Sequence, residues 1–356
     1  MFSSGCGIFQ GDEIRQRGCY QELGDRAIHP NDCMLYSEVQ YENRQQINEQ
    51  STPSQQVPEP FDPQQELDWT PVWSLTHQRF KYIPTAYGYY GYPRAKNPYC
   101  WANSNGAAAG NTVEEAILQG FMELVERDGV ALWWYNRVQR PGVDLASFDD
   151  PYLKEVVEYY RSIDRQMWVI DMTTDLNVPT FTAISRRVDR EIEDIVFGFG
   201  AHFDPKIALL RAITEMNQVL PAVLSMADDG TTEYRFNDPV ALDWWQRATI
   251  ANQPYLVPDS RVKMKGYGDY SRMGREDLAD DVRSCVNIAG KQGLEVLVLD
   301  QTRPDIGLPV VKVIVPGLRH FWGRLAFGRL YDVPVILGWL SKPLLESQLN
   351  PIPMFL

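Results

Sequence analysis

The chain has 356 residues, a formal net charge of -13 and 44% hydrophobic residues. Its length allows one large domain or two smaller ones, and no linker or shift in composition divides it. The acidity argues against nucleic acid and anionic membranes as partners. No apolar run reaches the length of a membrane-spanning helix. The five cysteines have no metal-binding spacing, and their odd number is typical of a reducing compartment, so we expect a cytoplasmic protein.

The order of the predicted elements favours an α+β fold. The first 60 residues are polar and predict an irregular region with local helix. Strands are predicted at 69–76 and 82–90, where β-branched and aromatic residues dominate. The later elements are helices at 112–134 and 151–163, a strand at 167–173, a hairpin at 179–187 and 194–202, helices at 205–220, 239–250 and 276–292, and strands at 294–302 and 308–315. Paired strands mixed with helices indicate largely antiparallel sheets with helices packed on one face.

The most informative segment joins a loop of small residues to a helix rich in acids. At about 100° per residue, Glu115, Glu123 and Glu126 fall within about 80° of one another. Asn111 lies one turn earlier on the same face. Divalent metals prefer several oxygen ligands, so this face predicts a site for metal and polyphosphate. Two simpler interpretations stay open: Glu115 fits a capping-box pattern, and Glu123 with Glu126 fits a solvated surface.

A second segment, 197–220, repeats this pattern of a glycine-containing strand end followed by a helix. When the two helices are aligned, Glu215 matches Glu123 and Gln218 matches Glu126. The match predicts an internal strand–loop–helix repeat. The alternative is that two amphipathic helices resemble each other by chance.

Motifs that are absent narrow the chemistry further. The chain has no phosphate-binding P-loop, no nucleophile elbow and no H-E-x-x-H zinc motif. Its four histidines are isolated and are interpreted as structural. Arg127 and Arg211 accompany the acids of the two segments, and arginines bind phosphate oxygens in a fork. Carboxylates for Mg²⁺ beside arginines for phosphate are suited to phosphoryl transfer.

Two long motifs resemble the YcaO domain family, GNTVEEAILQGFMELVERD at 110–128 and GAHFDPKIALLRAITEMNQ at 200–218. The segment at 300–324, DQTRPDIGLPVVKVIVPGLRHFWGR, and the final NPIPMFL are more narrowly similar to D-protein cyclodehydratases. These enzymes form azolines in ribosomal peptides such as bacteriocins and thiazole/oxazole-modified microcins. The resemblance covers nearly the whole chain, as a single domain at 1–356 with a proline-containing tail at 343–356.

The resemblance implies an enzyme that depends on ATP and Mg²⁺. In the family, a Cys, Ser or Thr side chain attacks the preceding carbonyl, ATP phosphorylates the amide oxygen, and loss of phosphate leaves a thiazoline or oxazoline. The residues that the resemblance implies for nucleotide binding are Asn111, Glu115, Arg127, Arg211 and Gln218. Those that it implies for Mg²⁺ are Glu115, Glu123, Glu126 and Glu215.

The chain departs from the family pattern at both ends. The family tail carries P-x-P-x-P and is implicated in catalysis; here Pro351 and Pro353 are present, and Phe355 stands where the third proline falls. An earlier family motif, S-x-x-x-E-x-x-E-R, precedes a tract like the one at 7–13 and is absent. We therefore expect a domain that lacks its N-terminal part. A mis-set start codon, an upstream-encoded fragment that completes the site, and a decayed remnant are the explanations left open.

Partners follow from the same resemblance. They are a ribosomal precursor peptide and a ubiquitin-activating-like protein that binds its leader, and a homo-oligomer is expected. Two other functions stay open. One is a non-catalytic binding or scaffold module, suggested by the missing motif, and the other is an ATP-dependent relative that forms thioamides.

Overall fold

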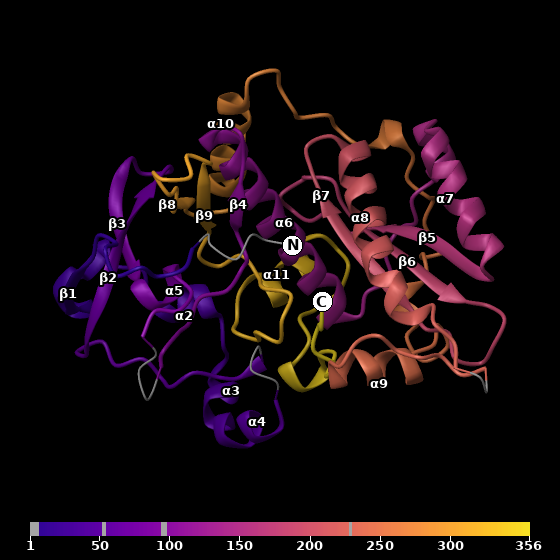
Figure 1. Cartoon of the computed structure of the whole chain (residues 1–356), viewed down its shortest axis with the longest axis horizontal. Coiled ribbons are helices and arrows are strands. Elements are labelled where there is room, and N and C mark those ends of the chain that lie inside the picture. The colour runs from indigo at the N-terminus through magenta and orange to yellow at the C-terminus, as the bar shows by residue number, and fades with distance from the viewer. Residues whose placement is uncertain (1–6, 52–54, 94–97, 228–229) are drawn as a thin grey trace. The chain divides into compact units, whose positions relative to one another are not determined.

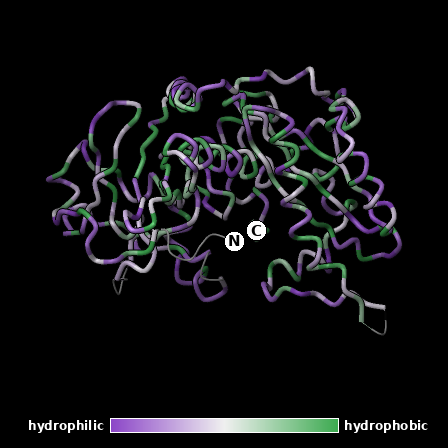
Figure 2. Tube along the Cα trace, turned by 45° about the horizontal axis from the view of Figure 1, so that its top comes forward, coloured by the Kyte–Doolittle hydropathy of each residue, from purple (hydrophilic) through white to green (hydrophobic). Residues whose placement is uncertain are grey.

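The computed structural model describes residues 7–51, 55–93, 98–227 and 230–356, which form two compact units (Figure 1). The first unit comprises Met1–Leu124 and Arg275–Leu330, and the second comprises Val125–Gly274 and Tyr331–Leu356. Hydrophobic and hydrophilic segments alternate along the chain in both units (Figure 2). That the chain acts as the single domain expected from the sequence stays a prediction.

The first unit contains a six-stranded sheet in which the named strands pair antiparallel. The strand order is β1-β2-β8-β9-β4, and β3 pairs with β2 off this path. The strands are β1 (Gln16–Cys19), β2 (Glu66–Ser74), β3 (Arg79–Pro84), β4 (Ala107–Ala109), β8 (Leu297–Asp300) and β9 (Val310–Ile314). The helices are α1 (Tyr20–Leu23), α2 (Pro30–Met34), α3 (Glu38–Glu42), α4 (Arg44–Gln50), α5 (Thr85–Gly88), α10 (Leu278–Lys291) and the first part of α6 (Val113–Asn136). A buried cluster that includes Ile83, Leu297 and Ile314 fills its core.

The second unit is built on a three-stranded antiparallel sheet, β5-β6-β7. Its strands are β5 (Arg165–Asp171), β6 (Thr180–Arg187) and β7 (Val196–Ala201). Its helices are α7 (Pro151–Ser162), α8 (Pro205–Val219), α9 (Pro239–Arg247) and the second part of α6. The short α11 (Arg329–Ile336) begins in the first unit and ends in the second.

Helices cover both faces of the β5-β6-β7 sheet. Strand residues alternate between faces, and glycines at 198 and 200 let α8 lie directly on one face, within contact distance of Ala212. On the other face, the ring of Phe197 packs against Trp134 of α6 and Trp244 of α9. The α+β class with antiparallel sheets is confirmed.

Most elements predicted from the sequence are confirmed, including α7, α8, α10 and the β6–β7 hairpin. The strand predicted at 82–90 is wrong beyond Pro84, because the next four residues form α5. There the Tyr89 N–H donates to the Thr85 carbonyl, and the Thr85 hydroxyl pairs with that of Thr70. The segment between α9 and Tyr267 contains the short 3-10 turn Pro254–Leu256. Strand β1 and helix α11 were not predicted from the sequence.

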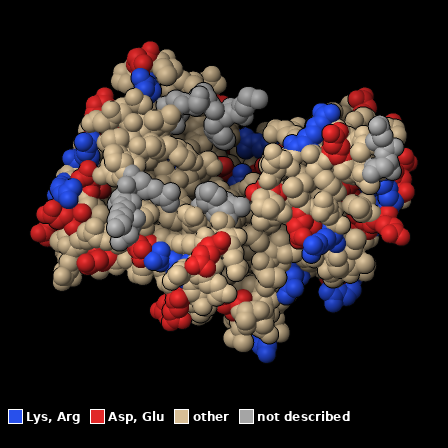
Figure 3. All heavy atoms as spheres, turned by 60° about the horizontal axis from the view of Figure 1, so that its bottom comes forward, with Lys and Arg blue, Asp and Glu red and all other residues tan. Residues whose placement is uncertain are grey.

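Charged residues are interspersed on the surface. On the face drawn in Figure 3, Lys and Arg side chains lie among Asp and Glu side chains of the described residues. Over the same part of the chain, no helix is both long and apolar enough to cross a membrane. The expectation of no nucleic-acid partner stays a prediction.

The contact between β7 and α8 leads to a test of stability. A methyl group on residue 198 meets the Met216 nitrogen at 2.1 Å. We expect Gly198→Ala to lower the free energy of unfolding by about 1–3 kcal/mol or more, because the helix must move off the strand. Gly290 of α10 is exposed with open space around it, so Gly290→Ala gains up to about 1 kcal/mol. Urea denaturation of both variants checks this; equal effects contradict it.

Candidate functional site

The start of α6 brings Asn111 and Glu115 together in the first unit. The Thr112 hydroxyl accepts the Glu115 N–H at 3.1 Å, as a helix cap does. The Glu115 carboxylate turns to Asn111 and accepts from its N–H at 2.7 Å and from its Nδ2 at 2.9 Å. The capping interpretation therefore explains the backbone of Glu115, while its carboxylate is held by the residue that the resemblance pairs with it.

Glu123 lies two turns further along α6, half-buried, and its carboxylate accepts the Gly106 N–H at 2.9 Å. This bond requires the helix to approach the strand end closely. A methyl group on Gly120 meets the Gly106 oxygen at 2.6 Å, and one on Gly106 meets the Val313 oxygen at 2.0 Å. The two glycines thus permit the contact that orients Glu123.

In the second unit, three charged side chains gather between α6 and α8. The Arg127 guanidinium lies 3.1 Å from the Glu126 carboxylate and 3.9 Å from the Glu215 carboxylate. Glu126 is only 9% exposed, so its interpretation as solvated surface is wrong. Arg211 donates to the Ala201 oxygen at 3.3 Å. Burial lowers the pKa of Arg211, and the charge of Glu126 opposes this shift.

The two units hold their aligned glutamates in the same way. Glu215 of α8 accepts the Phe199 N–H from the preceding strand, as Glu123 accepts the Gly106 N–H. In each unit the glutamate stands on a helix that follows a strand and a loop, and small residues bring helix and strand together. This shared geometry supports the internal repeat over chance resemblance.

The metal-binding role expected for the four glutamates depends on how many carboxylates lie close together. Among the described residues, no group of three or more His, Cys, Asp or Glu side chains is arranged to hold a metal. Mg²⁺, however, keeps several waters and is commonly held by one or two carboxylates together with substrate phosphates. A carboxylate has about four acceptor sites, so a single N–H bond orients it without using its capacity. The donors fit Mg²⁺ that arrives with a polyphosphate.

Three of the expected positions are less closely tied to these groups. Gln218 is exposed on α8, one turn beyond Glu215. Pro351 is exposed and Pro353 half-buried in the C-terminal tail. Neither proline can donate a backbone hydrogen bond.

The tail itself is anchored to the second half of α6 through alternate residues. The Asn350 Nδ2 donates to the Trp134 oxygen at 3.3 Å and to the Tyr255 hydroxyl at 3.2 Å. The Trp134 indole donates to the Ile352 oxygen at 2.7 Å, and the Met354 N–H donates to the Tyr135 hydroxyl at 3.3 Å. The residues between these anchors are Pro351 and Pro353. The anchors therefore fix where both prolines lie along the helix.

Sequence reasoning assigned no role to Lys312, which is 1% exposed in β9. Its ammonium donates to the backbone oxygens of Asn103 and Asn105, in the loop that leads to Gly106. Burial lowers the pKa of Lys312 to about 8, against the charge of Glu123. The signal in the sequence is a single charge inside the apolar strand VVKVI.

A cavity of about 770 Å³ lies within the first unit, beside the loop that holds Glu123. Its aromatic lining consists of Tyr89, Tyr90, Tyr92, Tyr99, Trp101 and Trp322. It reaches Asn103 and Ser104, but none of the site residues expected from the sequence lines it. The position of this cavity therefore does not identify the carboxylates expected to bind metal.

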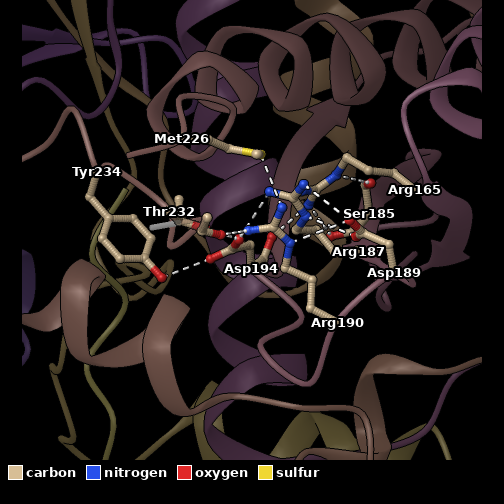
Figure 4. A network of polar contacts seen from close by, with 10 residues as sticks. Arg165, Ser185, Arg187, Asp189, Arg190, Asp194, Met226, Thr232 and Tyr234 are labelled. Atoms are coloured by element: carbon tan, nitrogen blue, oxygen red, sulfur yellow. Dashed lines mark hydrogen bonds and ion pairs between the residues drawn. The ribbon is translucent and has the colours of Figure 1, made fainter. Parts of the chain in front are cut away.

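A polar network at β5 and β6 holds the segment after α8 (Figure 4). The buried Asp194 accepts from the hydroxyls of Thr232 at 2.7 Å and Tyr234 at 2.8 Å, and it lies 3.7 Å from Arg187. Arg165 donates to the Asp194 backbone oxygen at 2.6 Å. These charges bind one another, and none of the expected site residues belongs to the network.

Carboxylates and arginines on two helices that each follow a strand suit a protein that binds phosphate with a divalent metal. Comparison with known proteins gives the family: residues 2–319 match the model described as YcaO cyclodehydratase, ATP- and Mg²⁺-binding. The chain belongs to the YcaO family. The resemblance predicted from the sequence motifs is thus confirmed.

Similar proteins agree with this assignment. A solved heterocyclase in complex with substrate and cofactor is 53% identical, with a TM-score of 0.92, and the match covers 98% of this chain and 46% of that one. The heterocyclase TruD is 52% identical, with a TM-score of 0.90, over 98% of this chain and 48% of its own. An uncharacterized protein of Methanothermobacter thermautotrophicus is 30% identical over 270 residues, which is 74% of this chain and 69% of that protein. The chain spans about half the length of the two heterocyclases.

The tail anchors can be tested through Asn350. We expect Asn350→Ala to lower the free energy of unfolding by about 1–3 kcal/mol, because the Trp134 oxygen and the Tyr255 hydroxyl lose a buried partner. Digestion by carboxypeptidase should also become faster. Gln348→Ala, an exposed change two residues away, is the control. Equal digestion rates for both variants contradict the anchoring role.

His202 gives a prediction about pH. Burial, and then the charge of Arg211, lowers the pKa of His202 from 6.5 to about 4. The unfolded chain therefore binds this proton first, so stability is full above the unfolded pKa and declines as pH falls from about 6.5 towards about 4. His202→Asn keeps an acceptor for the Asp204 N–H and removes the titration. Urea unfolding across this range should show a shallower decline for His202→Asn, and no such change for the exposed His77→Asn.

Proposed function

We propose that the chain is the YcaO subunit of an ATP-dependent peptide cyclodehydratase, which forms thiazolines or oxazolines in a ribosomal precursor peptide. The observation that carries the proposal is the paired arrangement of Glu123 on Gly106 and Glu215 on Phe199. It supplies two oriented carboxylates on matching units, one of them beside Arg127. The 53% identity to a heterocyclase that was solved with substrate and cofactor supports it further.

The proposed roles follow from the chemistry of each group. Glu115, Glu123, Glu126 and Glu215 hold Mg²⁺ through carboxylate oxygens. Arg127 and Arg211 bind phosphate oxygens, and Asn111 and Gln218 complete the nucleotide contacts. Bound ATP would supply the phosphoryl group that turns the amide oxygen into a leaving group, and Mg²⁺ would neutralise charge on the phosphates. The chain's own residues orient that group and offset its charge.

The tail belongs to this proposal through Pro351 and Pro353. Asn350, Ile352 and Met354 hold the backbone on either side of each proline. A fixed segment of this kind can position a peptide amide, because little freedom remains to be lost on binding. Removal of both prolines should therefore lower turnover more than nucleotide affinity.

The proposed partners are the precursor peptide, a ubiquitin-activating-like protein that binds its leader, and a polypeptide that carries the S-x-x-x-E-x-x-E-R motif. Self-association is part of the proposal as well. The four described cysteines are free, which supports a reducing compartment such as the cytoplasm.

Two other functions make different predictions about nucleotide and product. A scaffold module binds the partner proteins without ATP. A thioamide-forming relative binds ATP and Mg²⁺ and exchanges oxygen for sulfur, whereas ring closure removes one water per ring. The mass of the modified peptide separates these products.

Calorimetry with Mg²⁺ and AMPPCP, a non-hydrolysable ATP analogue, tests the proposal first. We expect binding by the wild-type chain and a loss of at least tenfold in affinity for Glu123→Gln and for Glu126→Gln, because a neutral amide is a poorer Mg²⁺ ligand. Glu114→Gln is the matched control, since Glu114 is exposed on the same turn as Glu115. Its affinity should stay within about twofold of wild type.

Three outcomes decide between the functions. Binding that needs Glu123 and Glu126, together with loss of one water per ring from a cysteine-containing precursor peptide, supports the cyclodehydratase. No binding, even after addition of the leader-binding partner and the polypeptide with the S-x-x-x-E-x-x-E-R motif, favours the scaffold. Equal loss in all three variants argues against these glutamates as metal ligands.

A further inference from the structure

We propose that Lys312 is a positioning residue for the metal-binding carboxylate of Glu123. It acts through the loop at 103–106, whose Gly106 N–H holds that carboxylate. The inference rests on the proposed role of Glu123 in Mg²⁺ binding. All groups concerned belong to the first unit.

Lys312 is an ammonium inside the core of the six-stranded sheet. It is 1% exposed, and its Nζ donates to the backbone oxygen of Asn103 at 2.5 Å and to that of Asn105 at 3.2 Å. The Tyr87 ring lies 5.2 Å from the same nitrogen. Burial of a charge is costly unless its donors are satisfied. The buried ammonium is therefore satisfied by backbone oxygens of a single loop.

The same loop is held from its other side by His320. The Asn105 Nδ2 lies 2.7 Å from the His320 Nδ1, and the His320 Nε2 lies 2.6 Å from the Cys33 oxygen. The Asn105 N–H also donates to the Asn103 side chain at 3.1 Å. The loop residue directly before Gly106 is thus fixed through its carbonyl, its N–H and its side chain.

Gly106 links this fixed loop to Glu123. Its carbonyl accepts the N–H of Val313, the residue after Lys312 in β9, at 2.7 Å. Its own N–H donates to Glu123 at 2.9 Å. Two consecutive residues of β9 therefore hold two consecutive residues of the loop, and the second loop residue orients the carboxylate. A partner that fixes a metal-binding group in this way commonly changes metal affinity by about 10–100-fold.

The lysine is harder to explain as packing. Methionine fills a similar volume without a buried charge, and burial of a charge is unfavourable unless its donors are satisfied. What methionine lacks is the ability to donate to the carbonyls of Asn103 and Asn105. The loop then loses its anchor, and Glu123 loses its fixed orientation.

The experiment compares Lys312→Met with Lys81→Met. Lys81 is also buried in this sheet, where its Nζ lies 3.4 Å from the Glu295 carboxylate. Mg²⁺ is titrated at a fixed concentration of AMPPCP, and urea unfolding is measured for each variant. We expect Lys312→Met to raise the apparent Kd for Mg²⁺ by about 10–100-fold. Lys81→Met should change unfolding and leave the Kd for Mg²⁺ within about twofold, because Glu295 is not among the proposed ligands.

A second variant covers the case in which Lys312→Met does not fold. Asn105→Ala removes the contact to His320 and keeps the lysine, so it should shift the Mg²⁺ dependence in the same direction by a smaller factor. The inference is overturned if folded Lys312→Met, or Asn105→Ala in its place, keeps the wild-type Kd for Mg²⁺, or if Lys81→Met shifts it equally.

Glu123→Gln separates this inference from the proposed function. If Glu123→Gln raises the Kd for Mg²⁺ and Lys312→Met does not, only the positioning role fails. If the wild-type chain does not bind Mg²⁺ with AMPPCP even after the partner polypeptides are added, or if Glu123→Gln has no effect, the proposed function itself fails.

Discussion

The hydrogen bond from a backbone N–H in or next to a strand to a glutamate on the following helix is the interaction on which the candidate site depends. It occurs in both units, from Gly106 to Glu123 and from Phe199 to Glu215. A half-buried carboxylate loses part of its hydration, and a backbone N–H restores that interaction at a fixed position. The bond forms only because small residues let helix and strand approach closely, as at Gly120 and Gly198. The close packing of helix against strand is therefore also what orients the carboxylate.

The other residues of the candidate site are held in place largely by burial. Arg127 lies between two carboxylates of the second unit, and the tail follows α6 with alternate residues anchored. In the first unit, the buried ammonium of Lys312 donates a hydrogen bond to the loop before Gly106. Fixed carboxylates and donors need little reorganisation when charge develops on a phosphate, and this preorganisation is what phosphoryl transfer requires. The buried lysine is tolerated in β9 because its ammonium donates to two backbone oxygens.

Much of the fold and part of the candidate site could be predicted from the sequence. Helical periodicity placed Glu115, Glu123 and Glu126 on one face, and alignment of the two helices paired Glu215 with Glu123, because both signals are local. Long-range contacts were out of reach. Nothing near Lys312 in the sequence indicates Asn105, and the bonds between the tail and α6 join residues more than two hundred positions apart. The short α5 was missed because its tyrosine and threonine favour strands, whereas a buried hydroxyl pair stabilises the helical turn.

The close approach of helix and strand also bears on how natural variants of this chain should be interpreted. If Glu123 binds Mg²⁺ as proposed, its replacement leaves the glycine contacts intact, so the protein should accumulate in the cell and be inactive. Replacement of Gly120 or Gly198 pushes the helix from the strand and raises the unfolded fraction, which proteases remove. Two variants with the same null phenotype would then differ in abundance. An abundance assay beside an activity assay would divide a variant collection into these groups without any further structure.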